Sequence, residues 1–130
     1  MKMSEEEVRA FFEQDLFAKH CGIRIDHIEE NQAICSMELT AKHRNAGGQV
    51  QGGAIFTLGD FAFAVAANSG EKKAVSLDNQ IAFMRKVQGD KLIATASVIS
   101  STYKICFYQV DIEDEWGTKV ARMSVTGYYV

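Results

Sequence analysis

The chain combines one long apolar run with several shorter segments of alternating character. Residues 52–68 are apolar or small almost throughout, which predicts a buried helix that stops at Asn68-Ser69-Gly70. The flanking segments read as strands separated by short polar turns. The predicted strands span residues 23–30, 32–39, 74–84, 91–100, 103–112 and 118–129.

The N-terminal residues predict a short helix. Ser4, followed by three glutamates, is an N-cap with a capping-box acid. We expect this helix to bury Val8, Phe11 and Phe12. A further helical turn is predicted over residues 15–20.

The long helix determines the expected architecture, because a helix that is apolar on nearly every side must be surrounded by other structure. The material available is an antiparallel sheet of five or six strands, so we expect an α+β fold in which a curved sheet wraps around one central helix. A length of 130 residues indicates one domain, over residues 1–130. Small residues in the helix permit close approach of the sheet or of a second copy of the helix.

Charge and composition exclude several classes of protein. A net charge of -3 gives no reason to expect nucleic acid or an anionic membrane as partner. The apolar run is slightly short for a membrane span and contains an acidic residue. The three cysteines are widely separated and lack metal-site spacing, which favours free thiols, no bound metal and a cytoplasmic location. The acidic N-terminus has no apolar core of a signal peptide.

Asp60 lies close to the middle of the apolar run. An ionised group is rarely buried without a partner, and burial raises the pKa of a carboxyl group. A more basic carboxylate suits a general base or a nucleophile, provided that one side opens on a pocket. The alternative is a structural aspartate that is hydrogen-bonded to a neighbouring loop.

The segment from Asn45 to Ala64 has the pattern N-x-x-G-x-V-x-G-G-A-x-F-T-L-x-D-x-A-F-A. This pattern resembles the hotdog-fold thioesterases, specifically the phenylacetic-acid-degradation branch of acyl-CoA thioesterases. Weaker similarities are residues 89–94 at a strand start and residues 126–130 at the end of the chain. The resemblance implies a hotdog fold and hydrolysis of an acyl-CoA to a free acid and coenzyme A, without a cofactor.

The resemblance also implies roles for four residues. The amide of Gly52 would bind the thioester carbonyl oxygen, and Asp60 would act as nucleophile or general base. Asn45 would orient the water or the thioester, and Ser76 is the candidate hydroxyl that supports the water. Gln51 stands where the family usually has histidine, so any role that needs a titrating imidazole is absent.

Helix geometry predicts that the site is shared between subunits. Gly52 and Asp60 are eight residues apart, which places them about 12 Å apart along one helix and roughly 80° apart around it. Both would have to reach one thioester group. Two antiparallel helices from two copies can bring them together, so we expect a homodimer with shared sites, further paired as a dimer of dimers.

Other residues are candidates for substrate binding. Gln51 and Gly53 flank the glycine whose amide would bind the carbonyl oxygen, and His43 adjoins Asn45. The remaining candidates, for coenzyme A phosphates, are cations that follow the helix, among them Arg85 and Lys91. The alternative is that these charges are ordinary solvated residues, and that the histidines are surface or loop residues.

Two other functions fit the same fold. A non-catalytic acyl-CoA sensor would be expected to lack the helix acid or to carry a DNA-binding domain. A hydratase or dehydratase would need a histidine after the helix, and His43 is the last histidine of the chain. The acyl group, and whether coenzyme A or an acyl carrier protein carries it, stay open.

Overall fold

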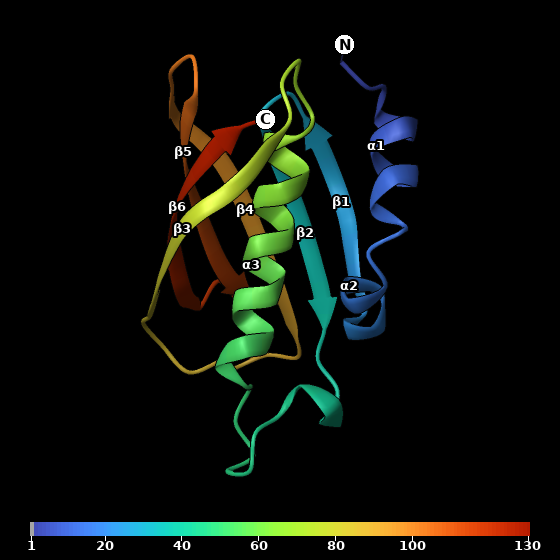
Figure 1. The fold of residues 1–130 in the computed structure, drawn as a ribbon. Coiled ribbons are helices and arrows are strands. Elements are labelled where there is room, and N and C mark those ends of the chain that lie inside the picture. The colour runs from blue at the N-terminus through green and yellow to red at the C-terminus, as the bar shows by residue number, and fades with distance from the viewer. Residues whose placement is uncertain (1) are drawn as a thin grey trace.

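The computed structural model describes residues 2–130, which form a six-stranded antiparallel sheet and a long helix on its concave side (Figure 1). The predicted α+β architecture is therefore confirmed. The elements in chain order are α1 (Glu5–Phe12), α2 (Leu16–Cys21), β1 (Ile23–Glu29), β2 (Gln32–Glu38), the 3-10 turn η1 (Ala41–His43), α3 (Gly52–Ala67), β3 (Ala74–Phe83), β4 (Lys91–Ser101), β5 (Ile105–Asp114) and β6 (Lys119–Tyr129).

The strands are ordered β1-β2-β4-β5-β6-β3, so that β1 and β3 form the two edges of the sheet. Register shifts interrupt β1 after Ile25, β3 after Ser76 and β4 after Val98. Bulges of this kind bend a strand and increase its twist. The sheet consequently curls around α3, and β3 lies on the opposite side of the helix from β1 (Figure 1).

The inner side of α3 packs closely on the sheet. Leu58, Phe63 and Val65 are fully buried against strand residues that are mostly small or branched. At Gly59 a side chain would overlap the sulfur of Met123 on β6 and would crowd Ile112 on β5. The small residues predicted to allow close approach of the sheet therefore do so at this position.

The outer side of α3 is not fully covered. Gly53 is exposed, and Thr57, Asp60 and Ala64 are partly exposed. Their spacing places them on one stripe of the helix, between β3 and α2, which we name the outer stripe (Figure 1). The predicted sheet wrapped around one central helix is confirmed, and the sheet leaves this one stripe of α3 partly exposed.

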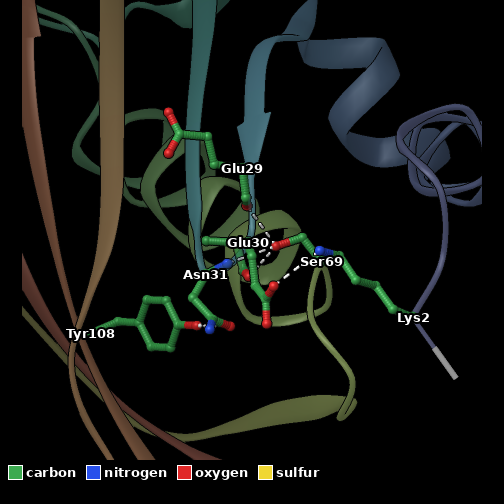
Figure 2. Close-up of polar contacts among 7 residues, drawn as sticks. Lys2, Glu29, Glu30, Asn31, Ser69 and Tyr108 are labelled. Atoms are coloured by element: carbon green, nitrogen blue, oxygen red, sulfur yellow. Dashed lines mark hydrogen bonds and ion pairs between the residues drawn. The ribbon is translucent and has the colours of Figure 1, made fainter.

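The end of α3 is fixed to the turn between β1 and β2 (Figure 2). The hydroxyl of Ser69 accepts a hydrogen bond from the Asn31 amide at 3.0 Å and lies 2.9 Å from the Glu29 carbonyl, to which it can donate. Tyr108 on β5 donates its hydroxyl proton to the Asn31 side chain at 3.2 Å. These bonds hold the helix in register with the sheet.

The N-terminal helices follow the predictions with one exception. Ser4 and Glu7 form the expected capping box, and Gly22 ends α2 in the left-handed conformation, with φ 81°. Val8 is buried, but Phe11 is 52% exposed, because it lies on the outward side of a helix that only edges the sheet. None of the helices within residues 2–130 is long and apolar enough to cross a membrane.

Strand boundaries differ from the predictions by up to two residues. The largest difference is β5, which begins at Ile105 rather than at residue 103. The residues before it are used by a tight turn, in which the Thr102 amide donates to the Ile105 carbonyl at 2.7 Å.

Asp114 joins two loops at one end of the sheet. Its buried carboxylate accepts amide hydrogen bonds from Gln88 and Gly89 in the β3–β4 loop and from Trp116 and Thr118 in the β5–β6 turn, at 2.9–3.0 Å. Burial alone would raise the pKa of this carboxyl, but the amide bonds to the charged form lower it to about 2. The network fixes the loop that begins directly after β3.

Replacing Asp114 with Asn should destabilise the fold by about 2 kcal/mol near neutral pH, because the amide group would face backbone donors. The folded pKa lies below the unfolded value, so this carboxylate stabilises the protein above about pH 4, and the contribution is lost as the pH falls toward 2. Urea unfolding of the wild type and of Asp114→Asn, from pH 7 down to pH 2, should show that the difference between their free energies of unfolding shrinks. Asp111→Asn, which affects a partly exposed carboxylate paired with Arg122 and Gln109, is the control. If Asp114→Asn lowers the free energy of unfolding equally at every pH, the stabilising role of the ionised Asp114 is wrong.

Candidate active site

Asp60 is held on the outer stripe of α3 in a partly buried position. Its Oδ1 accepts a hydrogen bond from Nδ2 of Asn79 on β3 at 3.0 Å. Burial raises the pKa of the Asp60 carboxyl, the Asn79 bond opposes this, and the negative charge of Asp15 adds to the rise. The site therefore contains a carboxylate that is more basic than a surface aspartate and is partly exposed.

The N-terminus of α3 offers two free backbone donors. Gln51 is the N-cap, and its Oε1 accepts the Ala54 amide at 3.2 Å. The amides of Gly52 and Gly53 donate to no other residue within residues 2–130. Unpaired amides at a helix start carry the positive end of the helix dipole, so they can stabilise a developing oxyanion.

The two halves of this chemistry are separated within one chain. Gly52 and Asp60 both belong to the continuous helix Gly52–Ala67, which keeps them about 12 Å apart. No bend brings them closer together. One copy of the chain thus presents a basic carboxylate and a pair of free amides, but at two different places along α3.

Asn45 organises the loop that precedes α3. Its Oδ1 accepts the amides of Gly47 at 2.9 Å and Gln49 at 3.1 Å. Because the oxygen is used within the loop, the Nδ2 group is the part of this side chain that can donate to a substrate. The loop is closed by an antiparallel bridge between Arg44 and Val50.

Two hollows lie on either side of the helix start. The first, of about 380 Å³, brings Gly52 together with Phe83, Arg85 and Lys86 at the end of β3. The second, of about 490 Å³, is lined mainly by α2, η1 and the first turns of α3. Its lining includes Phe17, His43, Gln51, Gly53 and Thr57. Lys91 lines neither hollow, and its backbone amide is bound to Glu115 at the start of β4.

His43 differs from the surface or loop histidine expected from the sequence, because it is buried. Its Nδ1 accepts the Thr40 amide at 2.9 Å, and its Nε2 lies 2.7 Å from the Cys21 carbonyl, to which it donates. This is the arrangement of a neutral imidazole with both nitrogens occupied. His43 therefore ties η1 to the end of α2 and shapes one wall of the second hollow.

Comparisons with known proteins identify the family and the fold of the chain. The sequence description of the thioesterase superfamily matches residues 47–121. The acyl-coenzyme A thioesterase PaaI of Escherichia coli is 35% identical over 89% of this chain and 84% of its own length. The solved structure of that protein, described as coming from the phenylacetic acid degradation operon, superposes with a TM-score of 0.90 at 32% identity, covering 96% of this chain and 91% of that one. A Thermus thermophilus structure matches with a TM-score of 0.85 at 27% identity, covering 90% of this chain and 99% of the other.

This chain belongs to the thioesterase superfamily. The resemblance to hotdog-fold thioesterases of the phenylacetic-acid-degradation branch is thereby confirmed. So is the prediction that the protein is a thioester hydrolase. The match begins in the glycine-rich loop and includes Gly52, Asp60 and the strands that follow.

The structure of this thioesterase adds one residue that the sequence did not indicate. Ser76, the candidate partner for the water, is exposed at the β3 bulge opposite Gly127. The residue that contacts Asp60 is instead Asn79, three positions later. Within residues 2–130, no group of three or more His, Cys, Asp or Glu side chains is placed to hold a metal ion.

The cap at the start of α3 can be tested through Gln51. Gln51→Ala should lower the free energy of unfolding by about 1 kcal/mol, because the Ala54 amide loses its side-chain acceptor. Gln51→His should fold normally and change thioesterase activity only modestly. Gln49→Ala, two residues earlier in the loop, is the control. A large gain in activity for Gln51→His, with a new titration near neutral pH, would show that the imidazole matters more than the cap.

Proposed function

We propose that this protein hydrolyses acyl-CoA thioesters at sites shared between two copies of the chain. The observation that carries the proposal is the division of the chemistry along α3. A basic carboxylate and the free amides lie on one helix, too far apart to act on one thioester group. The names of the relatives support acyl-CoA as the substrate.

The edge strand β3 supports a second copy as the missing half. Leu77 and Phe83 of β3 are 61% and 56% exposed, and Val75 and Met84 are about half exposed. An edge strand with such side chains is a site for pairing with another chain. A second copy placed against β3 would also lie next to the outer stripe, where its own α3 can run antiparallel to the first. A further pairing of two such dimers stays a prediction.

In this arrangement each group has a defined task. The Gly52 amide, with Gly53 beside it, stabilises the negative charge that develops on the thioester oxygen, and one such donor contributes about 2.7–4 kcal/mol. Nδ2 of Asn45 from the same copy donates to the carbonyl or to the water. Asp60 of the other copy acts as nucleophile, or as the base that takes a proton from water.

The first hollow supports the assignment of coenzyme A as the carrier. Arg85 and Lys86 lie beside Gly52 at the end of β3, where two cations can pair with phosphates. Lys91 lies outside both hollows, so it has weaker support than Arg85 as a phosphate contact. The second hollow, with Phe17 and Thr57 in its lining, offers apolar space for an acyl group.

Asp60→Asn should reduce kcat/KM for the best acyl-CoA by about 10²- to 10⁴-fold, the usual contribution of a general base. Folding should be retained, because Asn79 can still donate to the carboxamide oxygen. Turnover is measured as thiol release across a panel of acyl-CoAs, with Asp111→Asn as the control. If Asp60→Asn keeps most of the turnover, Asp60 is not the catalytic acid. If Asp60→Asn also unfolds far more easily than the wild type, Asp60 has a structural role. If the wild type binds acyl-CoA tightly but hydrolyses none of the panel, the protein is a binding module.

The shared site predicts complementation between two inactive variants. Asn45→Asp keeps the oxygen that closes the loop but removes the donor, whereas Asp60→Ala removes the carboxylate. Each homodimer should be nearly inactive. Random co-assembly makes about half of the dimers mixed, each with one complete site of two, so co-expression should restore about a quarter of wild-type activity.

Mass spectrometry of the co-expressed protein should confirm mixed dimers, and the two variants purified separately and mixed without exchange provide the control. If mixed dimers form but remain as inactive as either parent, both groups come from the same chain and the shared site is wrong.

A further inference from the structure

Asn79 lies on the side of β3 that faces α3, where its Nδ2 donates to Oδ1 of Asp60 at 3.0 Å. Side chains alternate along a strand, so its neighbours Asp78 and Gln80 point to the opposite face. Asn79 is also set in a regular part of the strand, opposite Val125 of β6 and beyond the bulge. Its direction toward the helix is therefore fixed by the backbone.

The other half of the Asn79 carboxamide has no partner. Its Oδ1 is buried and accepts no hydrogen bond within residues 2–130. A buried unpaired carbonyl destabilises a fold, and an apolar side chain of similar size would avoid the loss. Turning the amide around would place its oxygen against the Asp60 carboxylate. The observed orientation therefore stabilises the ionised form of Asp60, although it leaves the Asn79 oxygen unpaired.

The other groups near Asp60 do not stabilise its charge. Asp60 is the one ionisable residue of α3. Across from it, Asp15 caps the start of α2 and raises the pKa of Asp60 by repulsion. The neighbouring hollow that contains Asp15 is also lined by Arg9 of α1, Glu13 at its C-cap, Lys19 of α2 and Arg24 of β1. None of these four is among the groups that shift the pKa of Asp60. Of the contacts that act on the Asp60 carboxyl, the bond from Asn79 is the one that lowers its pKa.

The sheet contributes no opposing charge near neutral pH. The ionisable side chains on the core side of the sheet are Cys35, Cys106, Tyr108 and Asp114, which are buried, and Tyr129, which is partly buried. Burial raises the pKa of Cys35 to about 12 and also raises the pKa values of Cys106, Tyr108 and Tyr129, so these four are neutral. Asp114 is ionised but is occupied by backbone amides at the end of the sheet.

We propose that Asn79 is a positioning residue that holds Asp60 ionised and in one orientation for thioester hydrolysis. The inference rests on the proposed function of Asp60. It assigns Asn79 no contact with the substrate. Its effect is exerted through the carboxylate, which must be ionised to act as nucleophile or base.

The test compares Asn79→Leu with Gln80→Leu, the neighbouring position on the same strand whose side chain points away from α3. Loss of the donor should move the acidic limb of the kcat/KM profile to higher pH by about one unit, because a hydrogen bond to a charged group has about that effect. On that limb, kcat/KM should fall about tenfold. Gln80→Leu should have its acidic limb at the same pH as the wild type. Size-exclusion chromatography should show that Asn79→Leu and Gln80→Leu assemble in the same way.

Asn79→Asp is the second variant, and it changes the charge with little change in shape. Two carboxylates at this distance cannot both ionise easily, so the limb should move further than in Asn79→Leu. The expected order is wild type, Asn79→Leu, Asn79→Asp. If both variants fold and the acidic limb is the same in all three proteins, Asn79 has only a structural role.

A substrate-free measurement separates this inference from the proposed function. The carboxyl carbon of Asp60 can be followed by NMR in ¹³C-labelled protein and assigned by its absence in Asp60→Asn. Its titration should move to higher pH in Asn79→Leu even if no acyl-CoA in the panel is hydrolysed, in which case the proposed function fails and the positioning role stands. An unchanged titration, with active wild-type enzyme, overturns the positioning role alone.

Discussion

The packing of α3 on the concave side of the sheet is the interaction on which the rest of the structure depends. The helix is too apolar to be solvated, and at Gly59 a side chain would overlap the side chain of Met123 on β6 and crowd Ile112 on β5. Its far end is held by Ser69 and Asn31 (Figure 2). These contacts place the helix on the sheet, and the stripe that the sheet leaves partly exposed includes Asp60 and Gly53.

Groups of opposite charge lie at two places along α3. At its start, free amides carry partial positive charge, and the Gln51 cap leaves those of Gly52 and Gly53 available. Two turns later, burial and the charge of Asp15 make Asp60 more basic. Thioester hydrolysis needs both a positive field at the oxygen and a basic group at the carbon. A single helix carries both kinds of group, and their separation is the basis for the proposed pairing with the helix of a second copy.

The regions around the helix serve this arrangement in different ways. Asn45 uses its oxygen to shape the loop before α3 and leaves its amino group free. Asp114 fixes the loop that follows β3, and so the place of Arg85 and Lys86 beside Gly52. β3 itself is an exposed edge on one side and carries Asn79 on the other. The same strand thus joins the support of the carboxylate to the surface proposed for the second copy.

The sequence alone determined the elements, their order and the segment that is proposed to carry the chemistry, because capping, alternation and apolar runs depend on residues close together in the chain. Ser4, the 52–68 run and the string around Asp60 are examples. Tertiary structure decided which side of α3 stays open, why His43 is buried, and which strand residue reaches Asp60. Asn79 meets Asp60 across 19 positions of sequence. That pairing depends on strand register after a bulge, where a shift of one residue reverses the face of every side chain, and no local pattern predicts it.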